Sequence, residues 1–590
     1  SGNALTMSKR NYLMVAAIDF GTTYSGYAFS FKHEFDKDPL KISANNWTAG
    51  SRGLVSLKTP TTVLINSKKE FEAFGYEAED KYAELAEDED HTGWYYYRRF
   101  KMMLFDKTDL TRRTMLKDLE GKEMPAMTVF SMSIRYLRNH LLETLETRDT
   151  GTNESDILWV LSVPAIWNDS AKQFMREAAQ NAGINGEQLM IALEPEAASM
   201  FCKHLPVDRI LGAPDTGISV FSPGTKYLVL DAGGGTVDIT VHEVLPDRKV
   251  RELHKASGGD WGGTQVDEAF KQLLIKIVGN DVMFRFSRDH TADFLDMYRE
   301  FETKKRAIKG DIEGKVTFKI PIALKDIFEE TTSEDIKDAI AQSRYNAKLS
   351  WIGDKLRVDA DLMKGLFDSA ISGMTNHLRQ LFNEPTVKGT DTILLVGGFS
   401  DSPLLQEAVR KIFPLKRLII PHEAGLAVLK GAVIFGHQPE SISARVAKYT
   451  YGIEVYRNFD PNIHPVSKNV VIDGIEKCKD IFSKHVEKGE TVIVGQAKPE
   501  QRYTPVEDGQ KTLTMNVYVS TDRDPKFVSE SSCRFLGTLD VDAPVVNGKT
   551  SKEYGVWTKM IFGDTELKVE ARDEKSNKVT RSSFNFLGQA

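Results

Sequence analysis

The chain has 590 residues, 41% hydrophobic and 27% charged, with a formal net charge of −7. This length exceeds one hydrophobic core, so two or three structural units are expected. The modest negative net charge gives no electrostatic reason to expect nucleic-acid binding, and no apolar run approaches the ~18 residues that cross a bilayer. Three scattered cysteines favour neither a disulfide framework nor a zinc site, and residues 1–15 lack a secretory pattern. A cytoplasmic or nuclear location is expected.

The first element is a hairpin close to the N-terminus. Residues 1–10 are expected to be a flexible terminus, with an expression-tag remnant at Ser1–Thr6. Residues 15–31 combine an apolar run with an alternating run, which predicts two strands joined by a tight turn. The turn reads Asp19-Phe20-Gly21-Thr22-Thr23. Glycine lets backbone N–H groups approach a phosphate, and a carboxylate there implies a divalent cation between them. The alternative is an ordinary turn with an exposed Asp.

A second hairpin repeats the first about 200 residues later. Residues 227–244 contain the turn Asp231-Ala232-Gly233-Gly234-Gly235-Thr236-Val237-Asp238. Three consecutive glycines are costly in an ordinary hairpin, so something must require bare backbone there. Two turns that combine acids with glycines suggest a duplicated α/β half and two jaws that close on a polyphosphate.

Helices and buried strands surround the hairpins. Helical spacing of apolar residues predicts helices at Phe130–Glu146, Asp169–Ala182, Phe294–Lys309 and Asp361–Asn383. Short apolar runs predict strands at Ile157–Val163 and Thr392–Val396. Alternating βα units of this kind imply a mostly parallel sheet covered by helices on both faces. The Gly397-Gly398 pair after the second strand suits an adenosine-sized ligand, and a tight βα turn is the alternative.

The sequence pattern changes near residue 440. Short alternating runs separated by charged turns then predict an antiparallel β-sandwich, with strands at Thr491–Gln496, Thr512–Ser520, Arg534–Val541, Gly555–Phe562 and Glu566–Ala571. The expected organisation is an α/β nucleotide-binding domain at 11–440, a linker at 441–450 and the sandwich at 451–590.

Several motifs resemble those of the 70-kilodalton heat-shock ATPases. The phosphate motifs are similar to Ala17–Ser25 and Asp231–Asp238, and the connecting motif to Leu193–Ala198. The adenosine motifs resemble Glu302–Arg306 and Leu394–Ser400. Phe100-Lys101-Met102 and Tyr449–Ile453 resemble the divergent heat-shock 70 kDa protein 12-like branch.

The resemblance implies an actin-like ATPase with two ribonuclease-H-like halves that binds ATP or ADP with Mg²⁺. The metal would be held, largely through water, by Asp19, Glu194 and Asp231. Catalytic roles would fall to Lys101, Glu194, Asp231, Thr236 and Asp238. The nucleotide would contact Gly21, Thr22, Thr23, Tyr24, Gly233, Gly234, Gly235, Thr236, Gly258, Gly259, Glu302, Lys305, Arg306, Gly397, Gly398 and Phe399.

Three departures from the family pattern qualify these expectations. Asp401 stands where the family has an arginine on adenine. Ser441–Thr450 is basic, unlike the acidic, leucine-rich family linker, and no room is expected for a helical lid after the sandwich. We expect a slow ATPase, a stress-response chaperone or adaptor whose residues 451–590 bind a client peptide or partner protein. The alternatives are a non-catalytic scaffold and a sugar-type kinase; the oligomeric state stays open.

Overall fold

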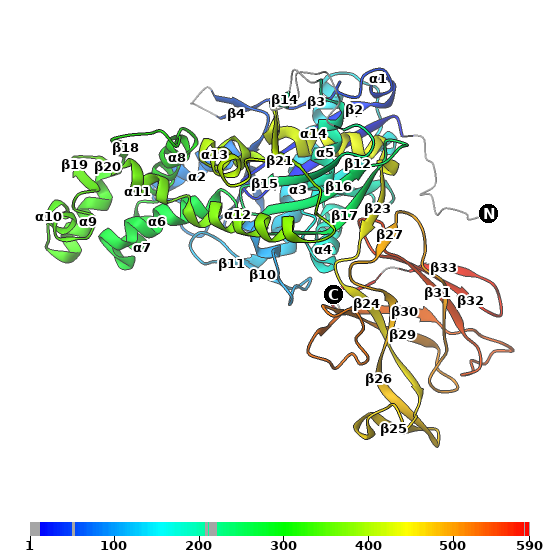
Figure 1. Ribbon diagram of the computed structural model, residues 1–590. Helices are drawn as coiled ribbons and strands as arrows, with labels where there is room; N and C mark the ends of the chain where they lie inside the picture. The colour runs from blue at the N-terminus through cyan, green and yellow to red at the C-terminus, as the bar shows by residue number, and fades with distance from the viewer. Residues whose placement is uncertain (1–11, 50–53, 207–209, 212–220, 583, 589–590) are drawn as a thin grey trace.

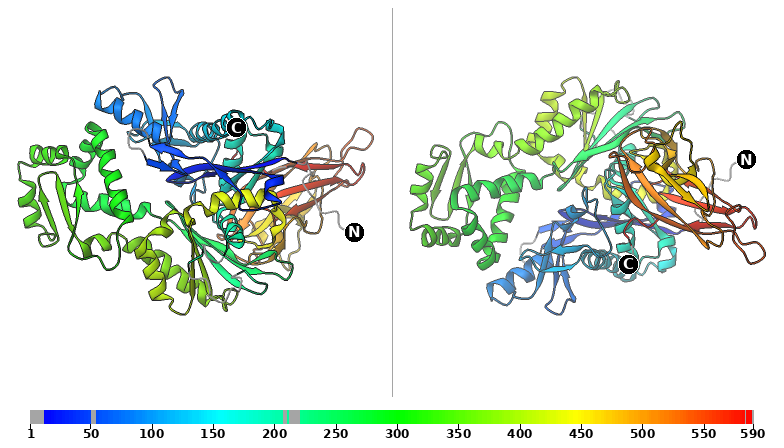
Figure 2. Two further views of the ribbon diagram at one scale, coloured as in Figure 1. Left: turned by 90° about the horizontal axis from the view of Figure 1, so that it is seen from above. Right: turned by 90° about the horizontal axis from the view of Figure 1, so that it is seen from below.

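The structure is a computed structural model that describes residues 12–49, 54–206, 210–211, 221–582 and 584–588. The N-terminal segment predicted to be flexible, residues 1–10, lies outside these ranges. Two α/β lobes lie side by side, and a C-terminal β-rich unit lies against one end of them (Figures 1 and 2). No helix in the described ranges is long and apolar enough to span a membrane.

The first lobe is built on a sheet with strand order β13-β12-β1-β2-β3. Strand β1 runs parallel to β12 and antiparallel to β2, so the predicted first hairpin is present. All seven residues of β1 are buried because helices cover both faces. The main elements are β1 (Met14–Phe20), β2 (Tyr24–Phe31), β3 (Ser43–Ala44), β12 (Ile157–Val163), β13 (Leu189–Leu193), α3 (Ala126–Thr147) and α4 (Asp169–Asn181).

Smaller elements extend this lobe. A three-stranded sheet has the order β8-β7-β9, and β6 pairs with β2 beside the first hairpin turn. The bounds are β4 (Trp47–Ala49), β5 (Leu54–Ser56), β6 (Thr59–Pro60), β7 (Thr62–Ile65), β8 (Phe71–Phe74), α2 (Tyr76–Glu87), β9 (Tyr95–Arg98), β10 (Met115–Lys117) and β11 (Glu123–Pro125).

The second lobe repeats the strand order of the first. Its sheet runs β14-β22-β21-β15-β16-β17-β23-β27, in which β22-β21-β15-β16-β17 corresponds to β13-β12-β1-β2-β3. Again the central strand is parallel to one neighbour and antiparallel to the next. The bounds are β14 (Ile210–Leu211), β15 (Lys226–Ala232), β16 (Val237–Val244), β17 (Val250–Gly259), β21 (Thr392–Val396), β22 (Arg417–Pro421), β23 (Ile442–Val446) and β27 (Thr491–Ile493).

Two helices, α5 (Glu194–His204) and α14 (Ala427–His437), pack together between the two sheets. A Cβ added to Gly431 would lie 1.7 Å from the carbonyl oxygen of Ala197, so only glycine permits this crossing. The lobes therefore share a close-packed helical contact, in which a small shift of one helix must move the other.

A helical subdomain extends the second lobe at the end away from the C-terminal unit (Figure 2). The predicted helix at Asp361–Asn383 is broken into α11 and α12, because Leu366 and Phe367 turn into the core after Gly365. The bounds are α6 (Thr264–Val278), α7 (Asn280–Asp289), α8 (Thr291–Arg306), β18 (Lys315–Lys319), α9 (Ile322–Thr332), α10 (Ile336–Gln342), β19 (Leu349–Ile352), β20 (Lys355–Asp359), α11 (Ala360–Gly365), α12 (Asp368–Asn383) and α13 (Pro403–Ile412).

The C-terminal unit contains two antiparallel sheets, β25-β26-β24-β29-β30 and β28-β31-β32-β33. Apolar side chains from both sheets belong to one hydrophobic cluster. The bounds are β24 (Thr450–Asn458), β25 (Asn469–Ile472), β26 (Ile475–Val486), β28 (Gln501–Tyr503), β29 (Thr512–Ser520), β30 (Cys533–Asp542), β31 (Val556–Ile561), β32 (Lys568–Asp573) and β33 (Val579–Ser582).

The segment predicted to be a linker forms strand β23, which adds to the sheet of the second lobe. Strand β27, predicted as part of the sandwich over Thr491–Gln496, is shorter and pairs with β23 instead. The pairing arises because the chain turns back at Gly489, whose N–H donates to the carbonyl of Ala447. The sheet of the second lobe therefore continues into the C-terminal unit.

Candidate functional site

The two glycine turns have the same local geometry. The N–H of Gly21 donates to the carbonyl of Tyr24 at 3.1 Å, and the N–H of Gly233 donates to the carbonyl of Thr236 at 3.0 Å. A Cβ on Gly21 would lie 2.2 Å from the Tyr24 oxygen, and a Cβ on Gly233 would lie 3.0 Å from the Thr236 oxygen. The first turn is therefore too tight for a larger residue at Gly21, and the second would be crowded by a Cβ at Gly233.

The turns of the two lobes meet face to face. A Cβ on Gly234 would lie 2.2 Å from Oγ1 of Thr23, and one on Gly235 would lie 2.7 Å from Oγ1 of Thr22. The predicted phosphate-contacting residues of both lobes thus occupy one place, although their hairpins are about 200 residues apart in the chain. Glycine is required here for contact between lobes as well as for turn geometry.

Four carboxylates gather beside these turns: Asp19 is the penultimate residue of β1, Glu194 opens α5, Asp231 lies near the end of β15, and Asp238 near the start of β16. Burial, followed by the charges of Glu194, Asp238 and Asp19, raises the pKa of Asp231 well above its usual range. Burial and Glu194 raise the pKa of Asp238 to about 7. Such shifts mark a place where negative charge is concentrated.

Two lysines contact this group directly. Lys101, on the short helix η2 (Phe100–Leu104), places Nζ 2.8 Å from Oε1 of Glu194 and 5.1 Å from the ring centre of Trp167. Lys58 places Nζ 2.6 Å from Oδ2 of Asp19. Burial alone would raise the pKa of Asp19, but Lys58 and Lys101 hold it below its usual value. Lys101 is one of the residues predicted from the motifs, whereas Lys58 belongs to none of them.

The donor set fits a hydrated magnesium ion. Carboxylate oxygens are the ligands that Mg²⁺ prefers, and it usually keeps several waters. Within the described residues, no three Asp, Glu, His or Cys side chains are arranged to ligate a metal directly. Oδ1 of Asp238 is buried and accepts no hydrogen bond from any described residue. A cation bound through water is thus compatible with these carboxylates, and Asp19, Glu194 and Asp231 would hold it.

The first of the two predicted adenosine motifs, Glu302–Arg306, lies on helix α8. Lys305 Nζ is 2.6 Å from Glu302 and 2.9 Å from Asp267, and Arg306 binds Glu302 at 2.9 Å. Burial opposes ionisation of Glu302, yet Lys305 and Arg306 lower its pKa to about 2. The guanidinium of Arg306 lies 5.6 Å from the ring centre of Tyr24, so α8 of the second lobe reaches the first hairpin.

The glycine pair after β21 also reaches the carboxylates. A Cβ on Gly397 would lie 2.5 Å from Oδ1 of Asp231, and its φ of +90° favours glycine. Gly398 and Phe399 open the short helix η6 (Gly398–Asp401). Burial raises the pKa of Asp401, and the charge of Arg306 opposes the shift.

Gly258 and Gly259, which are predicted to contact the nucleotide, lie on β17 opposite Asp238 and Val237. The segment that joins the glycine turn itself is Gly262–Thr264. Its N–H groups donate to the carbonyl oxygens of residues 233–235, at 2.7 to 3.1 Å. A further signal was available in the sequence, because Gly262-Gly263-Thr264 repeats the Gly-Gly-Thr pattern of the turn it contacts.

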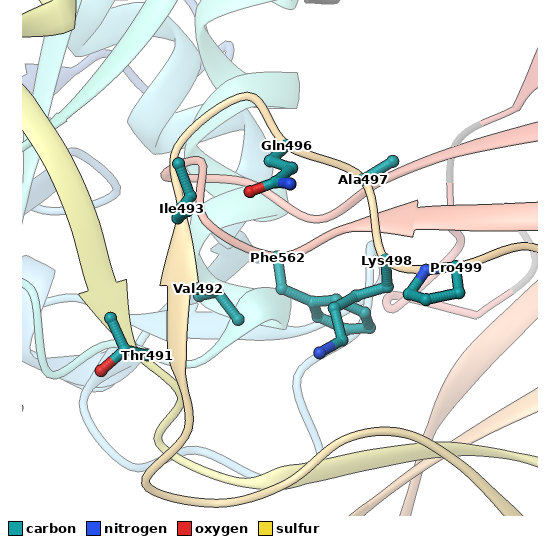
Figure 3. Close-up of a pocket in the computed structure, with 8 residues that line it drawn as sticks. All are labelled: Thr491, Val492, Ile493, Gln496, Ala497, Lys498, Pro499 and Phe562. Atoms are coloured by element: carbon teal, nitrogen blue, oxygen red, sulfur yellow. The ribbon is translucent and has the colours of Figure 1, made fainter. Parts of the chain in front are cut away.

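Two separate hollows lie near the C-terminal unit. One of about 180 Å³ is lined by residues that include Val492, Lys498 and Phe562 (Figure 3). The other, of about 80 Å³, lies where Glu252, Arg445 and Lys448 meet. Both lie beside β23 and β27, where the C-terminal unit joins the second lobe.

The two α/β lobes have the same strand order, and their glycine turns, each next to acidic residues, meet between the lobes. This arrangement defines the actin-like ATPase class of folds. Comparison with known proteins specifies the family. The Hsp70 protein family model matches residues 101–548. Human heat shock 70 kDa protein 12B is 36% identical over 98% of this chain and 91% of its own length. Mouse heat shock 70 kDa protein 12A is 36% identical over 98% and 92%. The chain belongs to the Hsp70 family, which confirms the resemblance found in the motifs.

Proposed function

We propose that this protein binds ATP and ADP with Mg²⁺ between its lobes, hydrolyses ATP slowly, and acts as an atypical Hsp70-like chaperone or adaptor. One observation carries the proposal: four carboxylates and two lysines gather where two glycine turns from different lobes touch. Acidic groups at such density need a cation, and backbone N–H groups of glycine turns need an anion. A magnesium-bound polyphosphate supplies both.

Each residue of the proposed site has a role that follows from its position. The turns at residues 21–24 and 233–236 present N–H and hydroxyl groups to the phosphates. Magnesium, held through water by Asp19, Glu194 and Asp231, would neutralise charge on the transferred phosphate. Lys101, Thr236 and Asp238 would position the phosphate and the attacking water. Catalysis of this kind depends on orientation and charge, with little covalent chemistry from the protein.

The test is binding and turnover on protein stripped of nucleotide. Calorimetry should detect ATP and ADP binding with Mg²⁺, and bound ligand should raise the melting temperature by mass action. Single-turnover hydrolysis should be slow in the wild type and slower still in Thr236→Ala. Absence of any binding at millimolar ATP would refute the proposal.

We further propose that residues 451–590 form a β-sandwich that binds a client peptide or partner protein. Large apolar side chains are exposed at the end of this unit farthest from the lobes, on and between β24, β25 and β26 (Figure 1). They include Tyr456, Ile463, Val466 and Val471, the last two 82% and 67% exposed. Anisotropy with labelled apolar peptides tests this, and Val466→Asp with Val471→Asp should weaken binding.

The second candidate function is a nucleotide-dependent scaffold without physiological turnover. It is favoured by the docking of the C-terminal unit on the first lobe, where Arg176 binds Glu566 at 2.5 Å and Tyr451 donates to Asp169 at 2.8 Å. Nucleotide binding with no measurable single-turnover hydrolysis would support it. A sugar-type kinase is not proposed, because the chain belongs to the Hsp70 family.

A further inference from the structure

We propose that Lys58 is a phosphate-site residue whose ammonium is a fixed cation that sustains nucleotide binding when magnesium is absent. The inference rests on the proposed nucleotide binding and adds a residue that the motifs do not mark. Lys58 Nζ lies 2.6 Å from Oδ2 of Asp19, the first residue of the Asp19–Thr23 turn. Oδ1 of Asp19 accepts from the hydroxyl of Ser162 at 3.0 Å, so both oxygens have partners.

The backbone around Lys58 is tied to the phosphate turn. Strand β6, which begins at the next residue, pairs with β2, and the N–H of Thr61 donates to the carbonyl of Thr23 at 2.9 Å. The hydroxyl of Thr61 donates to the carbonyl of Gly21 at 2.7 Å. These bonds hold residues 58–61 along the turn. The ammonium is therefore positioned by the same contacts that shape the turn.

The aliphatic part of the Lys58 side chain passes close to Gly26 on its way to Asp19. A Cβ on Gly26 would lie 3.3 Å from Cγ of Lys58, so a larger residue at 26 would crowd the stem. The Lys58 side chain is 19% exposed, against 6% for Asp19. The ammonium thus lies at the boundary between the buried carboxylates and the accessible side of the turn.

The positive charge of the Lys58 ammonium offsets part of the negative charge of the site. Lys58 and Lys101 each bind one carboxylate, which offsets two of the four acids at the site. A lysine cannot dissociate from the site as a metal can. A phosphate brought to the first turn therefore meets a positive group beside Asp19 in the absence of magnesium. In other words, Lys58 lowers the dependence of nucleotide binding on the metal.

The test is ADP affinity, measured by calorimetry on the nucleotide-stripped full chain in excess Mg²⁺ and in EDTA. Lys58→Met should weaken ADP binding in EDTA by roughly 10- to 100-fold, the range for a hydrogen bond to a charged group, and by less in Mg²⁺. Lys68→Met, an exposed lysine of the same lobe, is the matched control and should change neither value. Equal loss in both buffers, or none, would overturn the proposal.

Removing Lys58 also leaves the Asp19 carboxylate buried without its partner, which could weaken the fold. The pair Asp19→Asn and Asp19→Asn/Lys58→Met isolates the ammonium, because neither protein has a stranded carboxylate. Melting temperatures should match, while ADP affinity in EDTA should be at least tenfold lower in the double variant. Equal affinities would show that Lys58 only holds Asp19. A wild type that binds no ADP in Mg²⁺ would overturn the proposed function as well.

Discussion

Arg445 binds both carboxylate oxygens of Glu196, with Nε and one terminal nitrogen at 2.8 and 2.7 Å. Both side chains are buried. Glu196 lies two residues after Glu194, and the other terminal nitrogen of Arg445 donates to the carbonyl of Gly563 in the C-terminal unit. One side chain therefore connects the helix that begins at the candidate nucleotide site with the β-rich unit.

Breaking this pair from one side should be strongly destabilising. Arg445→Met leaves a buried glutamate without its partner, and such losses typically cost about 3–5 kcal/mol. The double variant Glu196→Gln/Arg445→Met should recover part of the loss, because no charge remains buried. Thermal melts of the single and double variants measure this coupling.

The control for this cycle is the more exposed pair Arg251–Glu243. Arg251→Met should change stability by less than about 1 kcal/mol. If Arg445→Met were as mild as Arg251→Met, the pair would have no special role in joining the two units.

The contribution of Glu252 to stability should fall as pH rises from about 5 to 8. Burial and the charge of Glu196 raise the pKa of Glu252 to about 8 from an ordinary value of 4.5. Over that interval the folded protein retains a proton that the unfolded chain releases, so the free energy of unfolding decreases with pH, by up to a few kcal/mol. Glu252→Gln should reduce the slope of melting temperature against pH.

The slope should be reduced rather than abolished in Glu252→Gln, because Asp238, with a pKa of about 7, acts in the same direction. The matched control is Glu440→Gln. Glu440 is exposed and stands two residues before β23, the strand that pairs with β17, on which Glu252 lies. A melting-temperature difference between the wild type and Glu252→Gln that stays constant from pH 5 to 8 would contradict the raised pKa of Glu252.

Asp231→Asn should reduce hydrolysis more than it reduces nucleotide binding. The benefit of metal orientation is greatest as charge moves in the transition state, so single-turnover rates should fall roughly 100-fold or more while ADP affinity changes less. The same change should raise the melting temperature of the nucleotide-free protein, because it removes one of several mutually repelling carboxylates. Equal losses in binding and rate would make Asp231 a ground-state ligand only.

Asp401→Arg should tighten ADP binding. An arginine there could stack on the base, and a guanidinium on a ring contributes about 0.5–2 kcal/mol depending on desolvation. The change also removes a carboxylate from the side of the site where Arg306 lies. ADP titration of both proteins decides the matter, and unchanged or weaker affinity would show that residue 401 does not face the base.

Local patterns predicted the parts of the fold that local interactions determine. Strands β12 and β21 were predicted with their observed bounds, and the two hairpins followed from an apolar run, a glycine turn and alternation. The apolar spacing continues through Leu366 and Phe367, so it predicts one continuous helix. The backbone turns at these residues and divides the segment into α11 and α12. The sequence of β23 predicts a linker, because the hydrophobic pattern of five residues is too short to indicate pairing with a distant strand.

Site residues that belong to one local motif could be predicted from the sequence. Residues that reach the site only through the fold could not. Asp19 and Asp231 each stand beside a glycine turn, so their chemistry can be read locally. Lys58 is 39 residues from Asp19 and stands among ordinary polar residues, so only the pairing of β6 with β2 reveals its place. Asp267, which binds both Lys305 and Arg99, was missed for the same reason.

Strand β23 has a consequence for protease susceptibility. Arg445 and Lys448 are the residues that trypsin would recognise between the two units, and a peptide bond must be extended and accessible to enter a protease. Here the backbone of residues 444–446 is hydrogen-bonded to β27, and both side chains are turned inward, Arg445 to Glu196 and Lys448 to the carbonyl of Ile166. The native protein should therefore resist cutting between its units, and nicking at these sites would report separation of the C-terminal unit before either unit unfolds.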